Sequence, residues 1–217
     1  MSTESQRRAF LKAFLAHAPF DGWTDRSLRA AGRDLGLDAG DVALLFPAGM
    51  RDLLKFFHDE MDRQLTAEAG RLDLASMKIR ERIAALVKLR IMALEPHREA
   101  ARRASLTLAL PLYADLALKG LSTTVDTIWR LAGDTATDWN YYSKRTILAG
   151  VYASTLLTWF ADHSQDYAET WAFLDRRIGD VMKIEKLKAE CRKATADLPS
   201  PARILGRIRH RSAHPAP

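Results

Sequence analysis

Cysteine is almost absent from the sequence, and long uncharged apolar runs are missing. Cys191 is the only cysteine in 217 residues, so the chain can form no internal disulfide and a reducing compartment is expected. The uncharged residues 146–161 are too few for a membrane-spanning helix, which needs about 20 apolar residues. The first ten residues hold no apolar signal segment, and Glu4 argues against a transit peptide. We therefore expect a bacterial-type cytoplasmic protein.

The short motifs of the common enzyme classes are also absent. No G-x-G-x-x-G, G-x-x-x-x-G-K, H-E-x-x-H or G-x-S-x-G occurs, and no Glu-x-x-His pair is available for a di-iron site. The histidines are scattered without metal spacing; His163 beside Asp162 suits a helix end better than an acid/base pair. The carboxylates of Asp59, Glu60 and Asp62 predict a solvated helix face. The sequence thus indicates no catalytic residue and no metal.

Apolar residues recur with helical spacing along most of the chain. Hydrophobic residues make up 47% of it, enough to bury a core at this length. Glycine and proline separate the periodic runs, at the places where helices begin or end. Residues 106–112 alternate with a period of two, like a strand, but Pro111 suits the first position of a helix. We predict an all-α protein and keep the strand as a minor alternative.

The N-terminal residues 1–48 have the layout of a helix-turn-helix. The expected elements are a helix over residues 4–17, a helix from Asp25 to about Leu35, a turn at Gly36, a short helix opened by Asp38, and Phe46 before a Pro-Gly break. This arrangement resembles the N-terminal domain of TetR-type repressors. The net charge of +6 admits nucleic acid, anionic lipid or an acidic protein as partner.

The short helix is poorly equipped to read DNA. It carries two aspartates and no Lys, Arg, Asn or Gln, whereas base edges and phosphates are read by hydrogen-bond donors and cations. We predict a vestigial helix-turn-helix kept for packing, with a DNA-binding regulator as the alternative.

Residues 138–160 join an aromatic, basic beginning to a long uncharged remainder. Asp138 is a good N-cap and predicts a helix from Trp139 to about Ala161. One face of this helix is apolar. The opposite face carries small residues every four positions, which allow another helix to approach closely, and we predict a dimer interface there: Thr146, Gly150, Ser154 and Thr158.

The first turns of this helix combine Trp139, Tyr141 and Tyr142 with Lys144 and Arg145. Aromatic side chains next to cations are typical of a protein-interface hot spot. The same aromatics suit the buried start of a helix equally well, and the pattern leaves both interpretations open.

Three linked motifs carry a family resemblance. They are I-W-R-L-A-G-D at residues 128–134, D-W-N-Y-Y-S-K-R-T-I-L-A-G-V-Y at 138–152 and D-x-x-x-T-W-x-F-L-D-R-R-I at 166–178. The chain resembles, from near Arg8 to about Met182, the Coq-nine family of ubiquinone-biosynthesis accessory proteins. The resemblance implies a TetR-like all-α fold, a homodimer built from the last long helices, and a hydrophobic lipid pocket. It also implies a di-iron demethoxyubiquinone hydroxylase as partner.

Carried over residue by residue, the family's partner-binding patch falls on Asp138, Tyr141, Tyr142 and Arg145, with Ile128 and Leu131 as apolar neighbours. Tyr141 stands where many relatives have Trp. A carrier of a prenylated quinone also needs an apolar tunnel between helices. Candidate lining residues are Ile83, Leu86, Val87, Ile91, Leu112, Leu116, Trp129, Tyr152, Leu156 and Trp159. A simply packed core is the alternative for each of them.

Residues 199–217 form a basic tail after a larger helical domain over residues 49–198. A short amphipathic helix is expected there, with Ile204, Leu205, Arg207 and Ile208 as a reversible membrane contact. The sequence thus predicts a non-catalytic homodimer that binds a phospholipid or an isoprenoid quinone precursor, its only non-protein component. It would present that lipid to the hydroxylase at the inner face of the bacterial inner membrane. A TetR-type transcriptional regulator with an apolar inducer pocket is the alternative.

Overall fold

The computed structural model describes residues 2–134 and 139–180, except for the side chains of residues 139–141. Residues 1–175 form one compact unit and residues 176–217 a second one. Within the described ranges the chain is helical and contains no strand. The helices are α1 (Thr3–Asp21), α2 (Asp25–Asp34), α3 (Ala39–Leu45), α4 (Met50–Ala69), α5 (Ile79–Met92), α6 (Arg98–Leu108), α7 (Ala114–Leu131) and α8 (Trp139–Ala161), followed by a helix over residues 168–180. The predicted all-α fold is confirmed.

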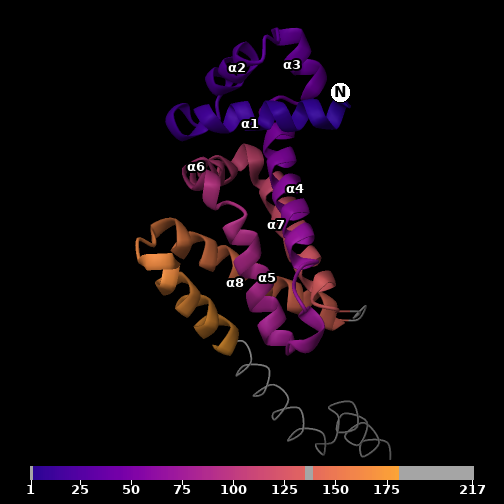
Figure 1. The fold of residues 1–217 in the computed structure, drawn as a ribbon, viewed down its shortest axis with the longest axis vertical. Coiled ribbons are helices and arrows are strands. Elements are labelled where there is room, and N and C mark those ends of the chain that lie inside the picture. Colours follow the sequence, from indigo (N-terminus) through magenta and orange to yellow (C-terminus); the bar gives the residue numbers. More distant parts are fainter. Residues whose placement is uncertain (1, 135–138, 181–217) are drawn as a thin grey trace, which may run out of the picture. The chain divides into compact units, whose positions relative to one another are not determined.

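The first three helices lie together at one end of the first unit (Figure 1). The side chains of Ser2 and Thr24 cap α1 and α2, and Asp38 and Asp41 form a capping box at α3. Gly36 adopts a φ of 67°, which favours glycine, in the turn between α2 and α3. These local signals explain why α2 and α3 begin where the sequence predicts, whereas α1 continues to Asp21, beyond the predicted end at residue 17.

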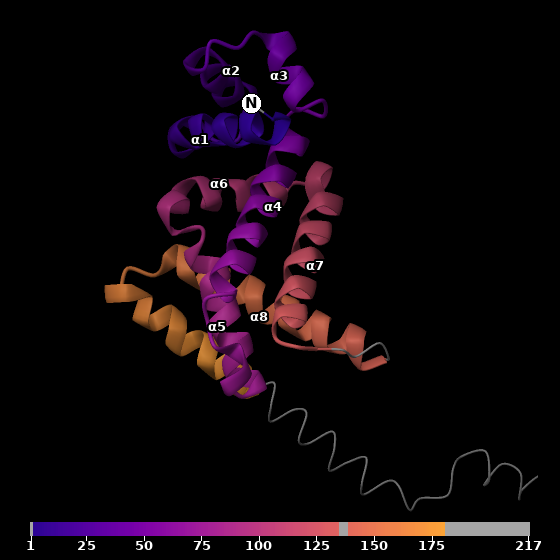
Figure 2. The same cartoon turned by 45° about the vertical axis from the view of Figure 1, so that its right-hand side comes forward.

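The longer helices form the rest of the unit. In Figure 2 α4 leads away from the first three helices, and it packs against both α5 and α7. Both α5 and α7 also pack against α8, so the uncharged part of α8 is covered by protein on one side. Within this face Leu148, Val151, Tyr152, Thr155 and Trp159 are buried.

The minor alternative of a strand at residues 106–112 is wrong. Helix α6 continues to Leu108, and Pro111 begins the short 3₁₀ helix η3 (Pro111–Tyr113), which leads into α7. Of the alternating leucines, Leu108 is buried at the end of α6, whereas Leu106, Leu110 and Leu112 are exposed, so the alternation does not mark one buried face of a strand.

The predicted solvated face at residues 59–62 also needs correction. Glu60 and Asp62 are buried, and only Asp59 lies on the exposed side of α4. Glu60 accepts hydrogen bonds from Arg63 and Arg8, which together lower its pKa although burial opposes them. Asp62 points into the core, where it meets an arginine of α5.

Among the described residues no single helix is both long and apolar enough to cross a membrane. Two consecutive segments, Ile79–Leu108 and Pro111–Leu131, reach that length and composition only when taken together across a sharp bend.

Candidate functional site

A buried ion pair lies between the helices that were predicted to hold a lipid. The Arg90 side chain is only 1% exposed, and its Nε donates to Asp62 Oδ1 at 2.6 Å. The Thr124 hydroxyl donates to both Asp62 oxygens, at 2.9 and 3.0 Å. The pair therefore ties α4, α5 and α7 together. Arg90 Nη1 has no hydrogen-bond partner among the described residues, which leaves one donor of a buried cation unused.

Two further polar side chains adjoin this pair. His58 Nδ1 lies 3.4 Å from Arg90 Nη2, and burial, followed by the charge of Arg90, lowers the pKa of His58 to about 3. Burial raises the pKa of Tyr152, whose hydroxyl also lies within the fields of Arg90 and Asp62. His58 and Tyr152 are consequently neutral at pH 7. The centre of the bundle is polar, with its one positive and one negative charge paired.

The predicted lipid-lining residues are buried or half-buried, with one exception. Ile83, Leu86, Val87, Ile91, Tyr152 and Trp159 are buried, whereas Leu116, Trp129 and Leu156 are half-buried. Leu112 is 71% exposed and lies on η3. The prediction that it lines an internal tunnel is therefore wrong. Its spacing fitted a helix, but the turn at Pro111 directs it outward.

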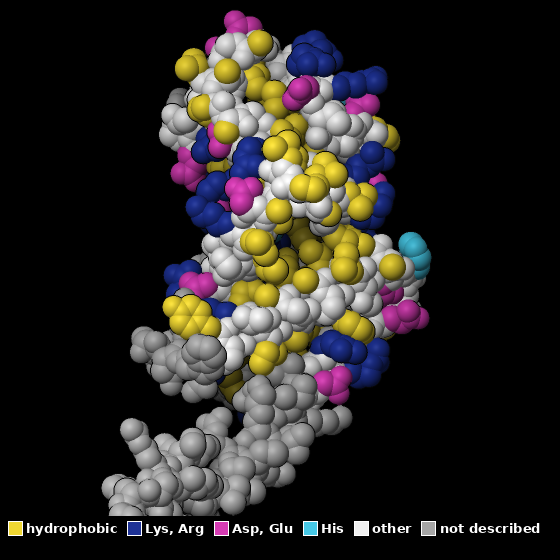
Figure 3. All heavy atoms as spheres, turned by 180° about the vertical axis from the view of Figure 1, so that it is seen from behind, with side chains coloured by type: hydrophobic (Ala, Val, Ile, Leu, Met, Phe, Trp, Pro, Cys, Tyr) yellow, Lys and Arg dark blue, Asp and Glu magenta, His cyan; other side chains and the backbone are white. Residues whose placement is uncertain are grey.

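The molecule is hollowed on the face shown in Figure 3, and hydrophobic side chains gather around the hollow. An apolar recess of this kind suits an aliphatic chain better than a charged metabolite.

The predicted partner site at the beginning of α8 is built on ion pairs. Arg145 donates from Nε to Asp126 at 3.0 Å and from Nη1 to Asp134 at 3.3 Å. Its side chain is only 14% exposed. Lys144 bonds to Asp134 at 2.8 Å and lies 5.4 Å from the ring centroid of Trp129. Both cations therefore fix the start of α8 to the end of α7.

The other residues of the predicted partner patch differ in how exposed they are. Tyr142 is 67% exposed beside these ion pairs, and Leu131 is half-buried. Ile128 is fully buried, so its role as a partner-facing neighbour is wrong, because α7 turns it into the core. Asp138 and the side chain of Tyr141 lie outside the described residues.

The small-residue ridge of α8 faces outward. Thr146 and Gly150 are exposed, and Ser154 and Thr158 are half-buried. The hydroxyls of Thr146, Ser154 and Thr158 each donate to the carbonyl one turn earlier, so the ridge presents little unsatisfied polarity. A Cβ atom at Gly150 would meet nothing within 4 Å. The ridge thus has room for a second helix, while the dimer itself stays a prediction.

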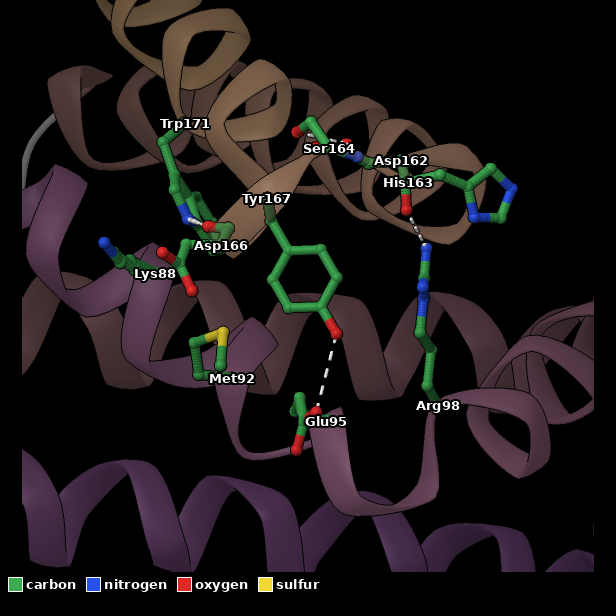
Figure 4. A pocket seen from close by; sticks show the side chains of 10 residues that line it. All are labelled: Lys88, Met92, Glu95, Arg98, Asp162, His163, Ser164, Asp166, Tyr167 and Trp171. Carbon is green, nitrogen blue, oxygen red and sulfur yellow. Dashed lines mark hydrogen bonds between the residues drawn. The ribbon is translucent and has the colours of Figure 1, made fainter.

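A polar pocket of about 580 Å³ lies where α8 ends (Figure 4). Arg98 donates to the carbonyls of Trp159 and Asp162 there, at 2.6 and 2.5 Å. Burial alone would raise the pKa of Asp162, but hydrogen bonds from Ser164 and Thr170 outweigh it and lower that pKa. These groups are occupied in joining α8 to the next helix. His163 is exposed beside them.

The predicted membrane contact at Ile204, Leu205, Arg207 and Ile208 lies outside the described residues. The domain boundaries predicted at residues 48 and 198 remain predictions too. Groups of three or more metal-binding side chains do not occur in the described part of the chain.

The chain is similar to known proteins in both sequence and fold. Residues 114–185, which contain α7, α8 and the helix after them, match the family model COQ9. The mitochondrial ubiquinone biosynthesis protein COQ9 of Rattus norvegicus is 32% identical over 191 residues, covering 84% of this chain and 61% of that protein. The Homo sapiens protein of the same name is 31% identical, covering 84% of this chain and 59% of that protein. The chain is similar to COQ9 proteins over most of its length.

This confirms the resemblance seen in the three sequence motifs. The chain spans about three fifths of the length of the curated COQ9 proteins that it matches. Among solved structures, a TetR transcriptional regulator from Nitrosomonas europaea aligns with a TM-score of 0.66 and 20% identity. The alignment covers 81% of this chain and 97% of the regulator, and it establishes a TetR-like fold alone. The COQ9 similarity and the TetR-like fold therefore agree with the architecture described above.

Proposed function

We propose that the protein is a non-catalytic accessory protein of ubiquinone biosynthesis that binds a prenylated quinone precursor. The observation that carries the proposal is the similarity to COQ9 proteins over 84% of the chain. The apolar hollow and the apolar faces of α5, α7 and α8 support a lipid as ligand, because an isoprenoid tail needs continuous hydrophobic walls.

In this proposal the protein works by binding and presentation. The lipid tail lies among residues such as Leu86, Ile91 and Leu156, and a di-iron demethoxyubiquinone hydroxylase docks at the beginning of α8. Tyr142 is the anchor of that docking surface, and Arg145 holds the surface in shape through Asp126 and Asp134. The ridge of α8 forms the homodimer. The protein is peripheral on the inner face of a bacterial inner membrane.

Lipid binding is tested by native mass spectrometry of the purified protein, followed by extraction of what it carries. The expected result is a dimer with bound isoprenoid or phospholipid, which organic solvent removes. An empty protein, even at high concentration and after expression in ubiquinone-producing cells, would contradict the proposal.

The docking surface is tested by hydroxylase capture with two matched variants. Tyr142→Ala should weaken capture by about tenfold or more, because exposed aromatic anchors carry much of the energy of an interface. Leu157→Ala is the control, since Leu157 has a similar exposed fraction, 66% against 67%, on the same helix. Equal loss in both variants, or none in either, would remove Tyr142 from the proposal.

A DNA-binding regulator is the second candidate, favoured only by the TetR-like fold. The exposed residues of α3 are Ala39, Gly40, Asp41, Ala43 and Leu44, which offer no cation to a phosphate. Specific retention of a DNA fragment, with a steep dependence on salt, would favour this candidate over the lipid carrier.

A further inference from the structure

Four leucines stand exposed around one corner of the first unit. Leu106, Leu110, Leu112 and Leu118 are 59%, 53%, 71% and 69% exposed, and all fall within residues 106–118. We call this segment the α6–α7 corner; it comprises the end of α6, η3 and the start of α7, which pack against one another. Single exposed leucines are ordinary in soluble proteins, whereas a group of them marks an interaction surface.

The backbone groups of the corner make hydrogen bonds within the protein. The amides of Ala109, Leu110 and Tyr113 donate to carbonyls three or four residues earlier, at 2.9–3.1 Å. Pro111 has no amide hydrogen, and the carbonyl of Leu112 accepts from Arg51 Nη1 at 2.7 Å. Such internal bonding removes much of the cost of placing a turn in hydrocarbon, where water cannot bond the peptide groups.

The hydroxyls at the end of α6 are satisfied in the same way. Ser105 donates to the carbonyl of Ala101 at 3.1 Å, and Thr107 donates to that of Arg103 at 3.0 Å. Leucine therefore dominates what the corner offers to its surroundings.

The charged residues next to the leucines are compatible with binding to an anionic membrane surface. Asp115 is the only acidic residue between positions 106 and 118, and Arg51 bonds it at 2.5 Å. Lys119 directly follows Leu118 and is exposed. Cations beside an exposed apolar group favour the headgroups of anionic lipids.

The composition favours a bilayer over a protein partner. Protein-interface hot spots are rich in Trp, Tyr and Arg, and leucine is under-represented in them. The aromatic residue of the corner, Tyr113, is half-buried beneath Arg51, whose guanidinium lies 5.8 Å from its ring centroid. The large apolar side chains that the corner exposes are therefore leucines.

We propose that the α6–α7 corner dips its leucines into the surface of an anionic phospholipid bilayer. This goes beyond the predicted tail contact, because it gives the folded unit a membrane-facing surface of its own. The proposal rests on the proposed function in one respect: a lipid carrier must contact the membrane that holds its lipid, and this surface would make that contact.

The test is flotation of the full-length protein with vesicles of phosphatidylcholine and phosphatidylglycerol. Leu112→Ser/Leu118→Ser is compared with Phe20→Ser/Leu44→Ser, which removes two other large apolar side chains, 81% and 79% exposed. Serine adds no charge, so electrostatic repulsion does not enter. The corner variant should bind vesicles about tenfold or more weakly than the parent, since each leucine contributes through the apolar area it buries. The control variant should bind as the parent does.

Native mass spectrometry of the same samples separates this proposal from the proposed function. The corner variant should keep its dimer mass and its bound lipid while it loses vesicle binding. Unchanged flotation, or an equal loss in the control variant, would overturn the membrane role. A loss of dimer in the corner variant would also overturn it, because the leucines would then be an interface between copies.

Discussion

Arg90 and Arg145 make the same kind of contact at different depths. Each donates to carboxylates of other parts of the chain, Arg90 to Asp62 and Arg145 to Asp126 and Asp134. The Arg90 side chain is 1% exposed, and its partner Asp62 also accepts a hydrogen bond from the Thr124 hydroxyl. The Arg145 side chain is 14% exposed and lies near the exposed Tyr142. Depth decides what an ion pair does, since an uncompensated charge is far more costly in the core than near water. Arg90 and Asp62, which we call the inner pair, therefore hold the bundle together. Arg145 with Asp126 and Asp134, which we call the outer pair, shapes a surface.

The largest expected effect comes from breaking the inner pair. Asp62→Ala leaves Arg90 charged and buried, and it should lower the free energy of unfolding by about 3–5 kcal/mol. Denaturation in urea measures the difference. The control is Asp59→Ala on the same helix, whose half-exposed pair with Lys55 contributes about 1 kcal/mol or less. Similar losses in the two variants would show that depth does not separate them.

The next effect is a dependence of stability on pH that comes from His58. Its pKa is about 3 in the folded protein, below the ordinary value of 6.5. Between these values the unfolded chain binds a proton that the folded protein does not, so stability is full above pH 6.5 and falls as the pH drops. The loss is at most about 1.4 kcal/mol per pH unit for one group. Unfolding measured from pH 7 to 4 should show a shallower slope in His58→Gln.

The matched control for that slope is His163→Gln. His163 is exposed, so its replacement should leave the pH dependence unchanged. A slope that flattens equally in both variants would mean that burial at the inner pair is not its source.

A smaller effect on stability is expected from the outer pair. Arg145→Ala should lower the free energy of unfolding by about 1–2 kcal/mol, because Asp126 keeps its ion pair with Arg130 and Asp134 keeps its ion pair with Lys144. The same variant should weaken hydroxylase capture, since α8 loses its fixed position on α7. Calorimetry and capture on one sample check both expectations. Normal capture by a destabilised protein would confine Arg145 to the fold, as Arg90 is.

The comparison also shows what periodicity can and cannot predict. Where local signals such as the Asp38 cap and Gly36 mark a helix end, the predicted boundary agrees with the structure; α1 has no such signal at residue 17 and continues to Asp21. Arg90 lies on the buried face of α5, but its partner Asp62 lies 28 residues earlier in sequence on α4, which the periodicity of α5 does not reveal. For the same reason Asp62 was assigned to solvent.

The candidate site was predictable to a lesser extent. Motifs located the beginning of α8, and Tyr142 is exposed there. They did not reveal that Arg145 is held by Asp126 and Asp134, because that contact depends on how α7 packs against α8. Ile128 could have been identified as core, since Thr124, Val125 and Ile128 share a buried face of α7. Contacts such as those of Arg145 depend on how two helices pack, and the sequence pattern of a single helix does not contain that information.

The most direct test of the account is the ubiquinone content of cells in which this protein is replaced by its Tyr142→Ala variant. The account predicts a normal amount of folded protein, lowered ubiquinone and an accumulated prenylated precursor, because the lipid is bound but not presented. Normal ubiquinone in these cells, together with normal ubiquinone in cells that lack the protein altogether, would contradict it.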